Sequence, residues 1–296
     1  MMKKLLYQFD TDALPSVFDN VVGYDGGADH ISAYGGVNAA NAGGLVEGAI
    51  FTRGPQDKKN TAIFIGGGNM LEGEAVLAAV RKKFFGKFRV SVMFDCNGSN
   101  TTASAAVAWL AHGRILAGKR AVVLAGSGPV GQRAAVLLAR EGAEVAVTGR
   151  KLDVVQAACD SIHARFGVAV RAIQAPTNVE RGAAIEGAHI VLAAGAAGIT
   201  LLDEKQWQDS AALELLADAN ASPPAGIAGV GQNDRGLTRH GKILFGSLGF
   251  GALKLALHRA CVSRLFQAND LVLDAEEIYA IAKQMVGGYA PAAEQR

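Results

Sequence analysis

Residues 122–151 read VVLAGSGPVGQRAAVLLAREGAEVAVTGRK, and this stretch decides the fold. A hydrophobic run typical of a buried strand leads into a glycine-rich turn, a helical pattern follows from Pro129, and a second apolar run comes near the end. Gly126, Gly128 and Gly131 have the G-x-G-x-x-G spacing of dinucleotide-binding proteins. Alone this spacing is a weak signal, but its strand–turn–helix–strand context predicts a Rossmann unit.

Each glycine of this turn has its own task. The first allows the tight turn, the second lets a pyrophosphate approach the backbone, and the third lets helix and strand pack closely. Free N–H groups at the start of the helix then face the phosphates. The alternative interpretation of this segment is a glycine-rich turn that binds no ligand. The residues predicted to bind the nucleotide are Gly126, Ser127, Gly128, Pro129, Val130, Gly131, Thr148, Gly149, Arg150, Lys151, Ala194, Gly195 and Asn220.

The stretch ends in two cations, at the place where an NAD enzyme commonly has an acid for the ribose hydroxyls. Arg150 can hold a 2′-phosphate through its planar guanidinium, and Lys151 adds a second positive charge. Both residues could instead be the solvated first turn of the next helix, although cations there oppose the helix dipole. The pattern therefore predicts NADP as the cofactor, with NAD as a weaker alternative.

The composition is that of a folded enzyme. The chain has 296 residues, enough for two domains, and 50% of them are hydrophobic while 19% are charged. The net charge of +2, with no long run of lysine or arginine, argues against nucleic acid or a membrane as partner. Apolar stretches end well before the ~20 residues of a membrane span. The N-terminus acquires acids too early for a secretory signal, so a soluble, cytoplasmic protein is predicted.

No metal site is predicted. The cysteines are odd in number, widely spaced and expected to be buried thiols: Cys96, Cys159 and Cys261. The segment YDGGADH brings Asp25, Asp29 and His30 together, but a full set of ligands is missing. A loop between a helix and a strand is the expected role of that segment.

The chain predicts two α/β domains: an N-terminal parallel-sheet domain and a Rossmann-type NADP-binding domain. The first covers residues 1–116 and is expected to be completed by C-terminal helices within 255–290, and the second covers 117–254. Strands are expected in the apolar runs KKLLYQFD, HISAYGG, TAIFIGGG, RVSVMFD, RAVVLAG, AEVAVTG, AVRAIQA, HIVLAAG and LELLADAN. Helices are expected around 15–25, 40–49, 70–85 and 99–116, from Pro129, Lys151 and Asn178, and within 248–267 and 274–286.

Several further segments carry a resemblance to a known family. QFDTDALPSVFDNVVGYDGGADH, DCNGSNTTASA, ADANASPPAGIAG and GSLGFGALKLALHRAC resemble the bacterial NAD(P)-dependent methylenetetrahydromethanopterin dehydrogenases of methylotrophic one-carbon metabolism, and most closely the NADP-dependent branch. The likeness covers essentially the whole chain. It implies a homo-oligomeric enzyme with a pterin cleft between its two domains, and a tetrahydromethanopterin-type or folate one-carbon carrier as substrate.

The implied chemistry is direct hydride transfer from a methylene carbon to the nicotinamide, which requires alignment and water exclusion but no side-chain base. The segment DCNGSNTTASA follows a predicted strand, and ligands bind at the carboxyl edge of such sheets. Asp95 and Lys254 are predicted to act in catalysis, the first by stabilising the developing cation and the second by orienting the pterin. A snorkelling lysine at a domain interface is an equal alternative for Lys254. The substrate-binding candidates are Asn97, Ser99, Asn100 and Thr102. For these residues and Asp95, an Asx-turn and helix cap is an equal alternative.

Other functions remain open at this point. One alternative is another NADP-linked oxidoreductase of the shikimate dehydrogenase-like or methylenetetrahydrofolate dehydrogenase-like type. The other alternative is a non-catalytic NADP sensor.

Overall fold

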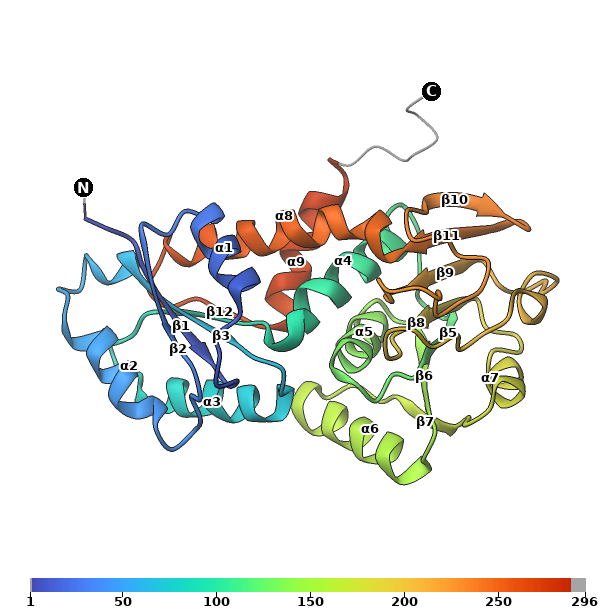
Figure 1. Cartoon of the computed structure of the whole chain (residues 1–296), viewed down its shortest axis with the longest axis horizontal. Helices are drawn as coiled ribbons and strands as arrows, with labels where there is room; N and C mark the ends of the chain where they lie inside the picture. Colours follow the sequence, from blue (N-terminus) through green and yellow to red (C-terminus); the bar gives the residue numbers. More distant parts are fainter. Residues whose placement is uncertain (1, 289–296) are drawn as a thin grey trace. The chain divides into compact units, whose positions relative to one another are not determined.

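The computed structural model describes residues 2–288, which form two α/β units (Figure 1). Unit 1 comprises the chain up to Thr101 together with Leu255–Ile281, and unit 2 comprises Thr102–Lys254 and the chain from Ala282 on. The predicted border at residue 116 lies after helix α4 (Ser99–Ala111), whereas the observed border lies in the first turn of that helix. Of the predicted completing segment 255–290, residues 289 and 290 lie outside the described residues.

Unit 1 is built on a five-stranded sheet of order β12-β4-β3-β1-β2, in which every pairing is parallel. Its strands are β1 (Leu5–Asp10), β2 (His30–Tyr34), β3 (Thr61–Gly66), β4 (Ser91–Phe94) and β12 (Val272–Leu273). Its connecting helices are α1 (Val17–Asp25), α2 (Ala42–Phe51) and α3 (Met70–Lys83). The chain runs from β1 to β2 on one side and continues through β3 on the other. The sheet therefore has its topological switch point between β1 and β3.

Unit 2 contains a seven-stranded sheet of order β10-β11-β9-β8-β5-β6-β7. Its strands are β5 (Arg120–Leu124), β6 (Glu144–Gly149), β7 (Arg171–Gln174), β8 (Ile190–Ala193), β9 (Leu215–Asp218), β10 (Arg235–Arg239) and β11 (Lys242–Gly246). Helices α5 (Pro129–Arg140), α6 (Leu152–Phe166) and α7 (Asn178–Ala184) connect parallel strands. Among the described strands of this sheet, only β10 pairs antiparallel. The switch point lies between β5 and β8, as in a Rossmann fold. Two further helices, α8 (Ser247–Leu265) and α9 (Ala275–Val286), have residues in both units.

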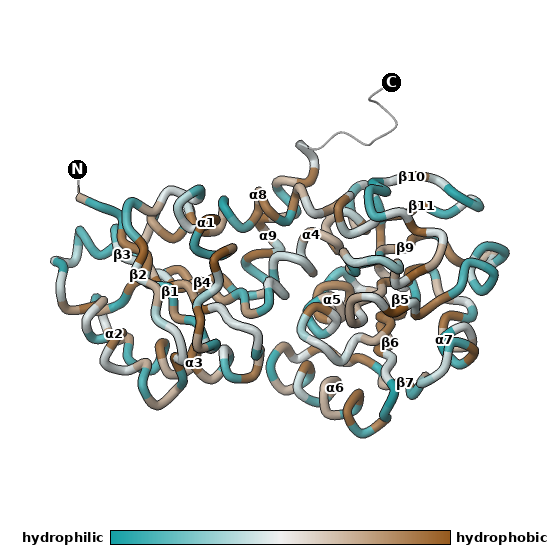
Figure 2. Tube along the Cα trace, in the orientation of Figure 1, coloured by the Kyte–Doolittle hydropathy of each residue, from teal (hydrophilic) through white to brown (hydrophobic). Residues whose placement is uncertain are grey.

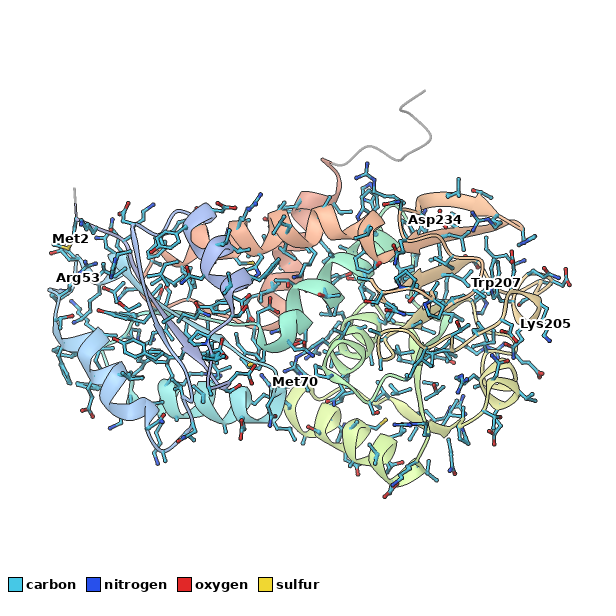
Figure 3. All side chains as sticks on the ribbon, viewed as in Figure 1. Met2, Arg53, Met70, Lys205, Trp207 and Asp234 are labelled. Carbon is cyan, nitrogen blue, oxygen red and sulfur yellow. The ribbon has the colours of Figure 1, made fainter. Side chains whose placement is uncertain are left out.

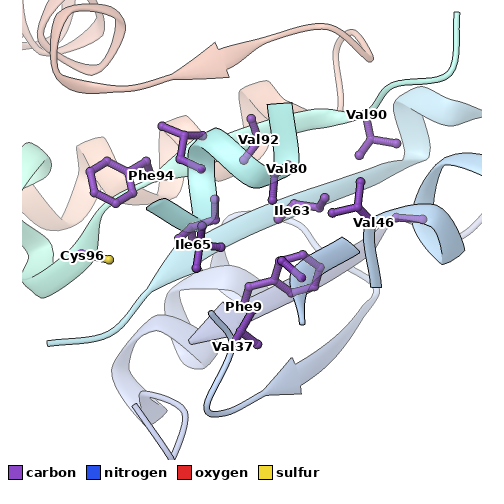
Figure 4. Close-up of a cluster of buried hydrophobic side chains, with 14 of the residues drawn as sticks. Phe9, Val37, Val46, Ile63, Ile65, Val80, Val90, Val92, Phe94 and Cys96 are labelled. Atoms are coloured by element: carbon purple, nitrogen blue, oxygen red, sulfur yellow. The ribbon is translucent and has the colours of Figure 1, made fainter. Parts of the chain in front are cut away.

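Each unit has its own hydrophobic core. The central strands β3, β5 and β8 are apolar runs buried on both faces, as expected for a parallel sheet (Figure 2). In unit 2, Trp207 packs into a buried cluster and donates from Nε1 to the Ala228 carbonyl at 2.9 Å (Figure 3). In unit 1, Phe9, Ile63 and Phe94 belong to the cluster drawn in Figure 4. Two independent cores confirm the predicted two-domain α/β class.

Two further features bear on the sequence predictions. The described cysteines are free and buried, as predicted. Among the described residues, no helix is both long and apolar enough to cross a membrane.

Candidate functional site

The turn between β5 and α5 is hydrogen-bonded to the end of β6. Gly126 donates its N–H to the Thr148 carbonyl at 2.9 Å, and Ala125 donates to the Thr148 side-chain oxygen at 3.1 Å. Thr148 is fully buried, so its predicted place at the nucleotide is a supporting one. Ala125 has a φ of 51°, a left-handed conformation uncommon for a residue with a side chain. Backbone strain of this kind persists where the surroundings enforce it, and it often marks a ligand site.

The three glycines of the turn differ in what a side chain would meet. A Cβ on Gly126 would lie 2.7 Å from a Val123 methyl, and one on Gly131 would lie 2.4 Å from the Gly126 Cα. A Cβ on Gly128 would meet nothing within 4 Å. The first and third glycines are therefore needed for packing. The second leaves open space where a pyrophosphate would approach the start of α5, beside Pro129.

A cavity of about 420 Å³ lies beside this turn and is lined by Ser127, Arg150, Lys151, Val154 and Val155. Val155 of α6 packs closely against Gly149 here, because a Cβ on Gly149 would lie 2.4 Å from a Val155 methyl. Two exposed cations thus face a cavity next to the phosphate turn. Polar Ser127 and apolar Val154 complete a lining suited to a phosphorylated ribose and an adjoining base.

The remaining predicted nucleotide residues follow β8 and β9, on the other side of the switch point. Ala194 donates its N–H to the Leu124 carbonyl at 3.0 Å, which ties the end of β8 to the start of the phosphate turn. Gly195 is partly exposed beside it. Asn220 is 6% exposed, and its amide donates to the Pro224 carbonyl at 2.9 Å. The Asn220 side chain therefore shapes its own loop.

Asp218, which the sequence reasoning did not single out, organises that loop. Its Oδ1 accepts the Asn220 N–H and its Oδ2 accepts the Ile227 N–H, both at 3.0 Å. One buried carboxylate thus joins the two ends of the loop 219–226. Burial raises the pKa of Asp218, and these backbone hydrogen bonds partly offset that rise. An acid two residues before a predicted site residue, at the end of a strand, was the available signal.

In unit 1, the polar segment after β4 is largely internal. Asp95 is 1% exposed; its Oδ1 accepts the Asn100 N–H at 2.8 Å and the Thr101 N–H at 3.0 Å. Its Oδ2 accepts the Thr101 hydroxyl at 2.7 Å. Asp95 thus caps α4. Ser99 and Asn100 are fully buried, and both donate to backbone carbonyls of the same segment.

Asn97 and Thr102 differ from these buried neighbours. Asn97 is exposed at the sheet edge, with a φ of 56°, and its N–H donates to the Gly67 carbonyl at 2.7 Å. Thr102 is partly exposed one turn into α4. Of the substrate-binding candidates, the structure therefore leaves Asn97 and Thr102 with surface that a ligand could reach.

The same edge contains residues that the sequence reasoning missed. His258 of α8 is 1% exposed; its Nδ1 lies 3.9 Å from Asp95 Oδ2, and its ring stacks on Phe64 at 5.4 Å. Asp10 ends β1 and is fully buried, while Asp12 follows it and accepts the Gly68 N–H at 2.9 Å. Asp12 could have been predicted as a site residue, because it follows the end of a strand. His258 could not, because its contact with Asp95 joins distant segments.

The other singled-out residues have separate positions. Lys254 is a partly buried residue of α8 and the last residue of its stretch of unit 2. Asp25 forms an ion pair with Arg259 at 2.6 Å, and Asp29 accepts the Lys4 N–H at 2.7 Å. His30 is exposed on β2. Within the described part of the chain, no three histidine, cysteine or acidic side chains are grouped so as to hold a metal ion.

Comparison with known proteins gives a consistent result. Residues 17–97 match the family model described as methylene-tetrahydromethanopterin dehydrogenase, N-terminal. The bifunctional protein MdtA of Methylorubrum extorquens is 57% identical over 287 residues, which are 96% of this chain and 100% of the relative. The NAD(P)-dependent methylenetetrahydromethanopterin dehydrogenase of the same organism is 32% identical over 297 residues, covering 97% of this chain and 100% of the relative.

Among solved structures, a shikimate 5-dehydrogenase from Listeria monocytogenes in complex with shikimate and NAD has a TM-score of 0.55. It is 13% identical, and the match covers 94% of this chain and 96% of that one. At this identity the likeness concerns the fold. It confirms the predicted Rossmann-type architecture and gives no support to shikimate as a substrate.

Proposed function

The chain belongs to the methylenetetrahydromethanopterin dehydrogenase family, and from this premise we propose that it oxidises methylenetetrahydromethanopterin to the methenyl form with NADP as hydride acceptor. The observation that carries the proposal is the 32% identical NAD(P)-dependent methylenetetrahydromethanopterin dehydrogenase, matched over 97% of the chain, together with the family model matched by residues 17–97. It favours this function over the shikimate dehydrogenase-like and folate dehydrogenase-like alternatives. The matched family is one of oxidoreductases, which also favours an enzyme over a non-catalytic NADP sensor.

The residues of unit 2 fit a dinucleotide with a 2′-phosphate. The open space before Gly128 suits the pyrophosphate, and the cavity beside it presents Arg150 and Lys151. Among residues 2–288, no carboxylate lines that cavity to accept hydrogen bonds from an unmodified ribose. NADP is therefore the proposed cofactor, and NAD remains the weaker alternative.

When bound, NADP would supply the hydride acceptor, the C4 atom of its nicotinamide ring. The chain's own task is to bind and orient. Gly128 and the start of α5 would hold the phosphates, and Asp218 fixes the loop after β9. Loss of a hydride leaves a cation that the substrate's two nitrogens share, so no side chain needs to move a proton.

For the pterin we propose a contact at the carboxyl edge of the unit 1 sheet, centred on Asn97 and Thr102. Asn97 offers both a donor and an acceptor at an exposed, conformationally fixed position. Asp95 acts without contacting the substrate: it caps α4 and adds negative potential where the substrate cation develops. Lys254 orients the polar edge of the pterin.

We further propose that a tetrahydrofolate carrier is a second substrate. A cytoplasmic, homo-oligomeric enzyme is the form expected from the family.

Steady-state kinetics with both pterins against both nucleotides test the function. The expected result is turnover of methylenetetrahydromethanopterin with NADP at the highest kcat/KM of the four combinations. Tight NADP binding without turnover of either pterin would identify a sensor instead. Turnover of shikimate in a parallel assay would identify the other oxidoreductase class.

A further inference from the structure

Three exposed phenylalanines lie together in unit 1, at the amino edge of its sheet. Phe51 ends α2 ahead of β3, and Phe85 and Phe88 precede β4. They are 55%, 53% and 38% exposed, and their ring centroids lie 5.0 to 6.2 Å apart. A contiguous group of half-exposed rings is a feature of interaction surfaces. Neither the nucleotide site nor the proposed pterin contact, both at carboxyl edges, makes use of it.

Cations accompany these rings. The segments 51–60 and 81–89 contain eight lysines and arginines and a single carboxylate, Asp57. The cations are Arg53, Lys58, Lys59, Arg81, Lys82, Lys83, Lys87 and Arg89; of these, Lys58 is buried and Lys83 is paired with Glu47 of α2. The whole chain is nearly balanced, with 29 cations and 27 acids. These two segments with their three phenylalanines, here called the basic aromatic patch, are therefore a local concentration of positive charge.

The patch is rigid at its tip. Phe85 donates its N–H to the Phe88 carbonyl at 3.2 Å, and Phe88 donates back at 2.8 Å, which closes a tight turn over Gly86 and Lys87. Gly86 has a φ of 47°, which glycine adopts without strain. The backbone groups of the two rings are thus already paired with each other. Such a turn can enter a medium poor in water without exposing those groups.

We propose that the basic aromatic patch docks this protein onto an anionic lipid bilayer. Lysines and arginines near a negatively charged leaflet are attracted to it, and apolar rings among them can enter the boundary between headgroups and acyl chains. Because the rest of the chain has 21 cations against 26 acids, and so a net negative charge, the attraction is confined to this patch and fixes the orientation. The expectation of no membrane partner used the net charge of the whole chain and the absence of a long basic run, and neither reveals cations that two separate segments bring together.

Other occupants fit the patch less well. Single-stranded nucleic acid binds by stacking bases on free ring faces. Here the Phe85 and Phe88 rings stack on each other, with an angle of 24° between their planes, and Lys58 Nζ lies 4.1 Å from the Phe88 centroid. A second copy joined by a two-fold axis through the patch would place like charges opposite one another.

The test is co-sedimentation of the full chain with vesicles. Equimolar phosphatidylcholine and phosphatidylserine vesicles are compared with pure phosphatidylcholine at two salt concentrations. Binding is expected to the anionic vesicles only, and to weaken as salt rises. Each lost cation corresponds to about fivefold in partitioning, from about 1 kcal/mol per charge, so Lys82→Gln/Lys87→Gln should bind about 25-fold more weakly. Phe85→Ser should reduce partitioning about tenfold.

A matched control removes two exposed cations elsewhere, Arg171→Gln/Lys205→Gln, and should partition like the parent. All variants should keep dehydrogenase activity, which separates this proposal from the proposed function. Equal binding to neutral vesicles, or no binding to either, would overturn it. So would stacking-dependent binding of a single-stranded oligonucleotide. A parent assembly that Phe85→Ser splits in sedimentation velocity would reassign the patch to contact between copies.

Discussion

Neutralising the two cations of the cavity should change nucleotide preference without harming the fold. In Arg150→Gln/Lys151→Gln both side chains are exposed, so the low end of ~1.5–3 kcal/mol for a charge-assisted hydrogen bond applies to each. At ~1.4 kcal/mol per tenfold change, the two losses together raise the KM for NADP about 100-fold. The KM for NAD, which has no 2′-phosphate, should stay within about twofold, because neither residue then has an anion to bind.

The structure adds an independent expectation for stability. Lys151 is the N-terminal cap residue of α6, makes no side-chain capping hydrogen bond, and places a cation against the positive end of the helix dipole. Its removal should therefore leave the ligand-free protein as stable as the parent or more stable, by about 0.3–1 kcal/mol.

The assay follows reduced nicotinamide with each nucleotide, beside urea denaturation of the ligand-free protein. Arg171→Gln/Lys205→Gln serves as the control, since it removes the same charge away from the cavity. The control should keep the parent's ratio of KM values. Equal losses for NADP and NAD in the cavity variant would refute the assignment of the 2′-phosphate site, and a lower unfolding free energy would refute the argument from the helix dipole.

Four single substitutions give further predictions. Gly128→Val should fold normally, because a Cβ there meets nothing within 4 Å, yet lose binding of both nucleotides in a titration; Gly131→Ala should instead unfold about 1–3 kcal/mol more easily, because its Cβ would lie 2.4 Å from backbone. Lys254→Met should lower kcat/KM for the pterin about tenfold with an unchanged pH profile, and loss of a kinetic pKa would show that a proton moves. The pKa of Asp218 is raised, so the folded state favours the protonated carboxyl. Protonation of Asp218 therefore stabilises the fold below pH 3.8, its pKa in the unfolded chain, and this stabilisation is lost as the pH rises through its pKa in the folded protein. Asp218→Asn should flatten that part of the stability–pH curve in urea denaturation and lower stability by about 1–3 kcal/mol, because an amide nitrogen cannot accept one of the two backbone N–H groups; parallel curves would contradict this.

The regular elements were predictable where the pattern was local. Long apolar runs bounded by glycine identified the parallel strands, since strands buried on both faces need no alternation of polar residues. The strands β10, β11 and β12 were not predicted. β10 reads RGLTR, with a polar and glycine-containing sequence at the edge of the sheet, and β12 has only two residues. Their pairing depends on neighbours far along the chain.

The two sites differ in predictability for the same reason. The nucleotide turn is encoded in one continuous stretch, and the structure brings Ser127 of the turn, Arg150 and Lys151 to a single cavity. The segment after β4 could serve a ligand or a helix cap from its residue types alone. The structure shows Asp95 capping α4, which the sequence had left as an equal alternative.

That capping role limits how the pterin contact can work. Asp95 has its two oxygens engaged by three donors and lies 3.9 Å from His258, so it cannot swing toward a substrate without uncapping α4. A buried carboxylate in a fixed network acts through its field and through the backbone that it holds, and that backbone includes Asn97 at its left-handed φ. Because hydride transfer requires alignment and no proton carrier, a rigid edge of this kind is sufficient. In the proposed contact, the selectivity for the pterin then depends on the few polar groups that this network leaves exposed.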